Sequence, residues 1–141
     1  MLRVSKAAGL AALVLLCAGV GSRAQAPSPK PDALANIELG LWEFKEIGRG
    51  AGATERRCLT SLRALLQPAQ PRLTCKHFIA ENGAAKAIVA YDCGARGQGR
   101  TALRVETPRL VSVDSQGVAD GRPFSVRVEV RRIGACMAAS R

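Results

Sequence analysis

The chain has 141 residues, with 21 basic side chains against 11 acidic ones and a formal net charge of +10. This length predicts one domain, and five cysteines in so small a chain favour a disulfide-stabilised protein. A single histidine excludes sites that are built from two histidines, whether catalytic or metal-binding. The basic charge suits anionic partners such as lipid headgroups, although arginines outnumber lysines 16 to 5 and are spread along the chain.

Residues 1–26 have the pattern of a secretory signal peptide. A basic start is followed by an uncharged apolar run over residues 7–20 and then by small residues. The run is shorter than the roughly 20 residues that a membrane-spanning helix needs. We therefore predict a periplasmic or secreted protein that is cleaved after Ala24 or Ala26 and is not integral to the membrane. The chain after Ala26 keeps 18 basic and 11 acidic residues, so it is still basic.

Three prolines predict an extended, solvated linker over residues 27–36. Residues 37–141 are predicted to form a single cysteine-bridged, β-rich domain. Its first strand lies within residues 37–47, and the apolar pattern there changes phase around Gly40, which indicates a bulge or a bend. Trp42, the only tryptophan, is interpreted as a core residue, with stacking on a ligand as the alternative.

The glycine-rich segment 48–52 is interpreted as a hairpin loop, because the helix and the lysine of a phosphate-binding loop do not follow it. A short helix of about two turns is predicted next. Its leucines recur at i, i+3 and i+4 from Leu62, Thr60 or Ser61 can cap it, and Pro68 ends it.

Strands are then predicted at residues 73–81, 84–93, 100–107, 110–113 and 124–131, with turns at Asn82-Gly83, 94–99, 115–117 and 120–121. Asn82-Gly83 is the strongest short hairpin signal. Apolar and polar side chains alternate from Phe124 to Arg131, which is typical of a strand with one buried face. The predicted fold class is mainly β: an antiparallel curved sheet or partial barrel, with one short α-helix and two disulfides.

Four cysteines follow the signal peptide: Cys58, Cys75, Cys93 and Cys136. In an oxidising compartment they predict two disulfides, with three possible pairings. A two-residue loop at Asn82-Gly83 places Cys75 opposite Ala90, so Cys93 points to the other face and a Cys75–Cys93 bridge is disfavoured; a three-residue loop would reverse this parity. Two pairings remain. We favour Cys58 with Cys75 and Cys93 with Cys136 over Cys58 with Cys93 and Cys75 with Cys136.

Three motifs flank these cysteines in a recognisable order: Gly40-Leu41-Trp42-Glu43, Cys58-Leu59-Thr60 before the short helix, and the closing Arg132-Ile133-Gly134-Ala135-Cys136. Over residues 37–136 the chain resembles the family of exported bacterial proteins catalogued as domain of unknown function 3617. Family members more often have aspartate at the position of Ala135, and many carry methionine- and glycine-rich middle segments that this chain lacks. The resemblance implies export, a cysteine-bridged β-rich domain and no assigned activity, and it supplies no catalytic residue.

Few side chains are arranged for catalysis. His77 has the parity of Cys75 and is interpreted as structural, and the cysteines lack the Cys-x-x-Cys pairs of zinc and redox sites, so we predict no metal and no cofactor. Nucleic-acid binding is disfavoured because the arginines are not interleaved with aromatic residues. The carboxylates that are candidates for sugar hydrolysis are Glu43, Glu46, Asp92 and Glu106.

The function favoured by this pattern is a non-enzymatic, exported module that binds an apolar or anionic amphiphilic ligand of the cell envelope. The candidate ligand contacts are Trp42, Arg56, Arg57, Arg104 and Arg109. Two alternatives stay open: a carboxylate-based envelope hydrolase, and an interaction partner of another envelope protein.

Overall fold

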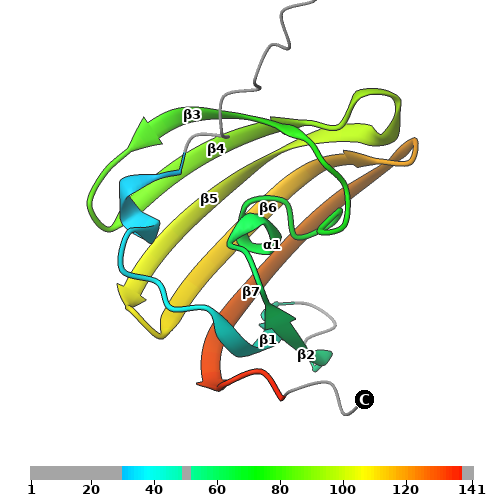
Figure 1. Ribbon diagram of the computed structural model, residues 1–141. Coiled ribbons are helices and arrows are strands. Elements are labelled where there is room, and N and C mark those ends of the chain that lie inside the picture. The colour runs from blue at the N-terminus through cyan, green and yellow to red at the C-terminus, as the bar shows by residue number, and fades with distance from the viewer. Residues whose placement is uncertain (1–29, 49–51, 138–141) are drawn as a thin grey trace, which may run out of the picture.

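The computed structural model describes residues 30–48 and 52–137, so the predicted signal peptide and the tip of the 48–52 loop lie outside the described residues. The described residues form one antiparallel sheet of seven strands in the order β2-β1-β7-β6-β5-β4-β3. Figure 1 shows this sheet as a curved surface, with a short α-helix in front of it. The sheet does not close on itself, because β2 and β3 are its two edges. The predicted fold class is confirmed.

The strands are β1 (Gly40–Glu46), β2 (Thr54–Leu59), β3 (Lys76–Asn82), β4 (Lys86–Asp92), β5 (Gly97–Thr107), β6 (Leu110–Ala119) and β7 (Arg122–Gly134). In β7 the alternation predicted from the sequence is confirmed, since Val128 and Val130 are buried while Arg127 and Arg131 are exposed. We call the face that carries these valines the inner face and the opposite face the outer face.

The turn predicted at residues 115–117 is wrong, because these residues continue β6. Ser115 is fully buried and follows the same inner-face alternation as Val113. Gly117 serves the sheet rather than a turn: a Cβ atom on it would lie 2.2 Å from the backbone oxygen of Gln98 on β5. Glycine therefore allows the two strands to approach here. The turn expected at Asp120-Gly121 does separate β6 from β7.

Residues 60–75 connect β2 to β3, and therefore run from one edge of the sheet to the other across the inner face (Figure 1). We call this segment the strap. It contains the predicted helix as α1 (Arg63–Leu66), which is only four residues long and ends before Pro68. The predicted capping is wrong: the residue before α1 is Leu62, and no side chain caps the helix. The helix is held instead by tertiary packing, because Leu65 and Leu66 are buried on the sheet.

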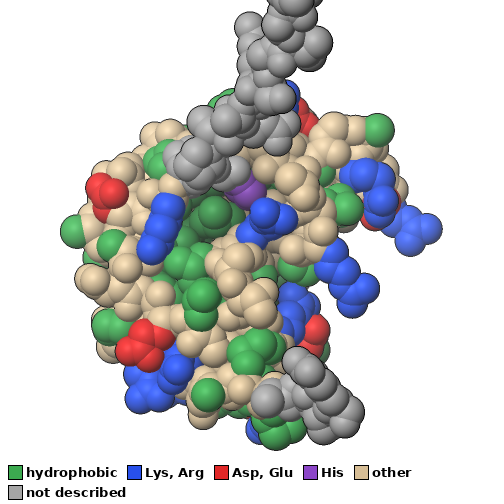
Figure 2. Space-filling model, in the orientation of Figure 1, with side chains coloured by type: hydrophobic (Ala, Val, Ile, Leu, Met, Phe, Trp, Pro, Cys, Tyr) green, Lys and Arg blue, Asp and Glu red, His purple; other side chains and the backbone are tan. Residues whose placement is uncertain are grey.

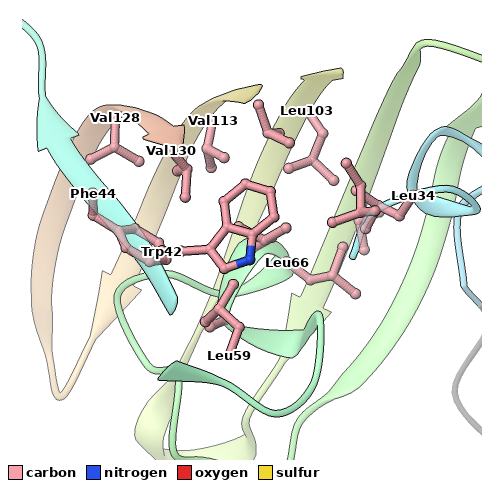
Figure 3. Close-up of a cluster of buried hydrophobic side chains, with 14 residues drawn as sticks. Leu34, Trp42, Phe44, Leu59, Leu66, Leu103, Val113, Val128 and Val130 are labelled. Atoms are coloured by element: carbon pink, nitrogen blue, oxygen red, sulfur yellow. The ribbon is translucent and has the colours of Figure 1, made fainter. Parts of the chain in front are cut away.

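Trp42 occupies the centre of the core between the sheet and the strap (Figure 3). Its side chain is fully buried, and its indole Nε1 donates a hydrogen bond to the backbone oxygen of Glu38 at 3.1 Å. The bend expected near Gly40 is also present: Gly40 has a φ of +147°, and the pairing of β1 with β7 shifts register directly after Leu41. Because an L-residue rarely adopts that φ, glycine fits this position.

The prediction of a solvated linker up to residue 36 is wrong for its described part. A 3-10 helix, η1 (Asp32–Leu34), lies within it, and Leu34 is fully buried in the core cluster. Pro31 is also fully buried. The segment folds because its apolar side chains pack on the inner face of the sheet, against β4 and β5.

The disulfides are Cys58–Cys136 and Cys75–Cys93, so the favoured pairing and the other pairing left open are both wrong. The reason is the register of the β3–β4 hairpin. Next to the turn Asn82 pairs with Ala87, and this register alone would still place Cys75 and Cys93 on opposite faces. A register shift between Ile79 and Glu81 adds one residue to β3 and reverses this parity. Lys76 then pairs with Asp92, and the two neighbouring cysteines face each other with their Cα atoms 4.3 Å apart.

Candidate binding groove

A groove of about 510 Å³ opens on the inner side of the molecule between η1, the strap and β3. Its apolar lining comes from Leu34, Ile37, Leu39, Leu62 and Leu66. Its polar lining comes from Lys30, Ser61, Arg63 and His77. Figure 2 shows this side of the molecule: an apolar hollow with the purple imidazole of the single histidine at its upper end and basic side chains beside it. No acidic side chain of the described residues lines the groove.

The strap and η1 supply the apolar walls for simple geometric reasons. Leu62 and Leu66 are four residues apart at α1, so they lie on the same side of the helix. Leu34 stands at the end of η1 and is fully buried, whereas Leu39 leads into β1 and is 49% exposed. The groove therefore has a buried floor and an accessible apolar rim.

Two cations stand at the rim of the groove, Lys30 and Arg63, and both are exposed. Among the described residues neither forms an ion pair, although the Lys30 Nζ lies 3.5 Å from the backbone oxygen of Ala35. Most other arginines on the strands are paired with an acidic neighbour, for example Arg127 with Asp114 at 2.8 Å. The groove thus offers positive charge that acidic side chains do not neutralise within ion-pair distance.

His77 projects from β3 onto the inner face and is only 7% exposed. Neither ring nitrogen has a hydrogen-bond partner among the described residues. Its ring centroid lies 6.5 Å from that of Tyr91, which is opposite it on β4. Burial lowers the pKa of His77, and the positive charge of Arg63 lowers it further. The imidazole is therefore neutral near pH 7, with one N–H donor and one acceptor nitrogen unused.

Tyr91 shares this buried corner with His77. Burial raises the pKa of its phenol. Its ring lies over Gly99, where a Cβ atom would stand 2.5 Å from the Tyr91 hydroxyl oxygen. Glycine in β5 thus makes room for the tyrosine ring. This packing holds the Tyr91 ring against β5.

None of the five residues predicted to contact a ligand lines this groove. Trp42 is fully buried, and the guanidinium of Arg57 stacks over the Phe44 ring at 4.9 Å. Arg56 pairs with Glu43 at 3.1 Å on β1, and Arg104 pairs with Glu106 at 3.0 Å on β5. Arg109 lies in the turn between β5 and β6, where its backbone oxygen accepts a hydrogen bond from the Arg132 N–H. The structure therefore does not unite them in one site.

The carboxylates considered for hydrolysis are not gathered either. Glu43 and Glu106 are each paired with an arginine, on β1 and β5. Asp92 accepts a hydrogen bond from the Gly94 N–H at 2.8 Å, as a turn residue does. Within residues 30–48 and 52–137, no group of three or more histidine, cysteine or acidic side chains is placed to hold a metal ion.

Sequence reasoning missed the groove because two of its walls came from segments that were assigned other roles. The proline pattern predicts a linker at Leu34, and the sequence around His77 offers only a catalytic or a structural interpretation. The signal that was available is the parity of β3, which places His77 on the same face as the half-buried Ile79. A polar side chain at a position that faces the core is expected to be buried, and it then provides a hydrogen-bonding group on an otherwise apolar face.

Comparison of the chain with protein-family models, curated proteins and solved structures finds no match in any of the three. The resemblance to the family of unknown function therefore stays a prediction from the motifs. In the described part of the chain, no helix is both long enough and apolar enough to cross a membrane.

Proposed function

We propose that this protein is a non-enzymatic binding module, exported to the periplasm or secreted, whose groove takes an apolar or anionic amphiphilic ligand of the cell envelope. The observation that carries the proposal is the combination of an apolar groove of about 510 Å³ with two cations, Lys30 and Arg63, at its rim. An amphiphile would place its apolar part on the leucines and keep its anionic group near these cations.

Export is supported by two observations of different kinds. Two disulfides fit an oxidising compartment, because cytosolic proteins rarely keep such bonds. The basic and apolar pattern of the first residues predicts a signal peptide. An envelope protein would meet lipids and lipid-derived anions, which are the ligands that the groove suits.

The proposal is tested by calorimetric titration of the purified protein with dodecanoate at low salt. We expect saturable binding of one equivalent. A Leu39→Asp variant should weaken it by about tenfold or more, because it places a negative charge on the apolar rim. Ile133→Asp is the matched control, since Ile133 is 39% exposed, does not line the groove and should not affect the titration.

The charged rim is tested separately with Arg63→Gln, for which Arg122→Gln at the start of β7 is the control. Arg63→Gln should weaken dodecanoate binding and reduce its dependence on salt, whereas Arg122→Gln should do neither. Absence of binding by the unmodified protein, or equal effects of the groove variants and their controls, would refute the proposed function.

A further inference from the structure

His77 stands out among the buried polar side chains of the inner face because both of its polar atoms lack a hydrogen-bond partner within the described part of the chain. The other buried polar residues satisfy at least part of their hydrogen-bonding capacity. Thr101 Oγ1 lies 2.8 Å from both the Leu66 backbone oxygen and the Ser115 Oγ. Gln70 Nε2 donates to the backbone oxygen of Arg96. A buried polar group without a partner destabilises a fold, so native proteins contain few of them.

The second notable property of His77 is where it lies. Tyr91 also has a buried hydroxyl with no hydrogen-bond partner in residues 30–48 and 52–137, but it does not line the groove beside η1 and the strap. His77 does line that groove, and it is more than nine-tenths buried. A molecule bound in the groove can therefore reach a hydrogen-bonding group on an otherwise mainly apolar surface.

We propose that His77 is the polar contact that selects the ligand: its ring N–H donates a hydrogen bond to a carboxylate or phosphate oxygen, while the apolar part of the ligand packs on Leu62 and Leu66. This inference rests on the proposed function and specifies the ligand head group and its position. The head group lies at the β3 side of the groove, beside the buried imidazole. An anionic oxygen fits this position because Arg63 is near enough to act on the imidazole electrostatically and no acidic residue of the described chain lines the groove.

The imidazole can be observed directly, because His77 is the only histidine in the chain and its ring signals in an NMR spectrum are unambiguous. The protein is titrated with dodecanoate, dodecyl phosphate and dodecanol, which share one tail. We expect the His77 ring N–H signal to shift when either anion binds. The shift should saturate with the same dissociation constant as the calorimetric titration. Dodecanol has the same tail without the charge and should bind more weakly than either anion. The relative affinities of dodecanoate and dodecyl phosphate then identify the preferred head group.

Two substitutions test the role of the imidazole. His77→Phe keeps a flat ring but removes the donor, and should weaken the binding of the anions by roughly tenfold to a hundredfold, the usual effect of a hydrogen bond to a charged group. His77→Gln keeps an N–H donor and should restore part of this loss. Tyr91→Phe removes the neighbouring buried hydroxyl and should leave the affinity unchanged. If His77→Phe folds poorly, the glutamine variant and the imidazole signal still decide the question.

Failure of this inference differs from failure of the proposed function. If the unmodified protein binds none of the three molecules, both are refuted. If it binds the anions while the imidazole signal stays unmoved and His77→Phe binds as well as the unmodified protein, the groove is a binding site but His77 does not select the ligand.

Discussion

The two disulfides are predicted to stabilise the fold unequally, because they close chain segments of very different length. Cys58–Cys136 spans 78 residues and Cys75–Cys93 spans 18. In the chain-entropy description, a cross-link stabilises the protein by restricting its unfolded chain, and more so for a longer loop. That relation gives about 4.5 kcal/mol for the 78-residue loop and about 3.2 kcal/mol for the 18-residue loop.

If each bridge were simply removed, the loss of unfolding free energy would combine the effect of the cross-link with that of the lost side-chain packing. The packing effect differs between the bridges, because Cys75 is buried and Cys58 is exposed. The comparison is therefore made within one variant at a time. Cys75→Ala with Cys93→Ala leaves only the long bridge, and Cys58→Ala with Cys136→Ala leaves only the short one. Each variant is unfolded in urea with and without a reductant. The loss of unfolding free energy on reduction then isolates the cross-link, since the side chains are otherwise the same.

We expect reduction to cost about 1.3 kcal/mol more in the variant that keeps the long bridge. Mass spectrometry without reductant should first show that each variant has formed its one remaining disulfide. Free thiols in both variants would show that the pairing is wrong. Equal losses, or a larger loss for the short bridge, would refute the loop-length reasoning.

Three further perturbations test the packing and the electrostatics. Trp42→Ala should lower the free energy of unfolding by about 3 to 5 kcal/mol in a urea titration, because the indole is fully buried at the centre of the core; a loss below about 1 kcal/mol would contradict that position. Gly117→Ala should cost about 1 to 3 kcal/mol because its Cβ atom would overlap the backbone of β5, whereas Gly134→Ala, with open space around the new atom, should cost less. Burial lowers the pKa of His77, so the unfolded chain binds its proton more readily: unfolding free energy should fall as the pH drops from about 7 to about 5.5, and His77→Gln should remove that part of the fall. An unchanged slope in the variant would refute this assignment.

The strand content could be predicted from the sequence because it depends on local alternation. From Phe124 to Arg131 apolar and polar residues alternate without interruption, and β7 has the predicted faces. The register of the β3–β4 hairpin could not be predicted in the same way. Asn82-Gly83 correctly marked the turn, but a loop of one more residue and the irregularity near Ala80 depend on how the whole sheet packs. The irregularity near Ala80 adds one residue to β3 and reverses the parity, and a regular register without it was enough to exclude the pairing that the structure shows.

The candidate site was harder to predict because its parts come from distant segments. Lys30, Leu34, Arg63 and His77 lie on the approach to η1, on η1 itself, on the strap and on β3. No local pattern connects them. The arginines that the sequence did suggest as contacts are largely engaged by neighbours, as Arg56 is by Glu43. A basic composition therefore indicated a preference for anions but not the position of an anion site.

The strap connects stability to the proposed binding. An open sheet with an apolar inner face needs a cover, and the chain supplies one by running between the two edge strands. A disulfide stands at each end of that cover, with Cys58 in β2 and Cys75 directly before β3. The helix α1 in this cover is only four residues long. The cover leaves part of the inner face open as the groove between the strap and η1. Leu66 belongs both to the core and to the wall of this groove, so whatever holds the strap on the sheet also fixes the shape of the site.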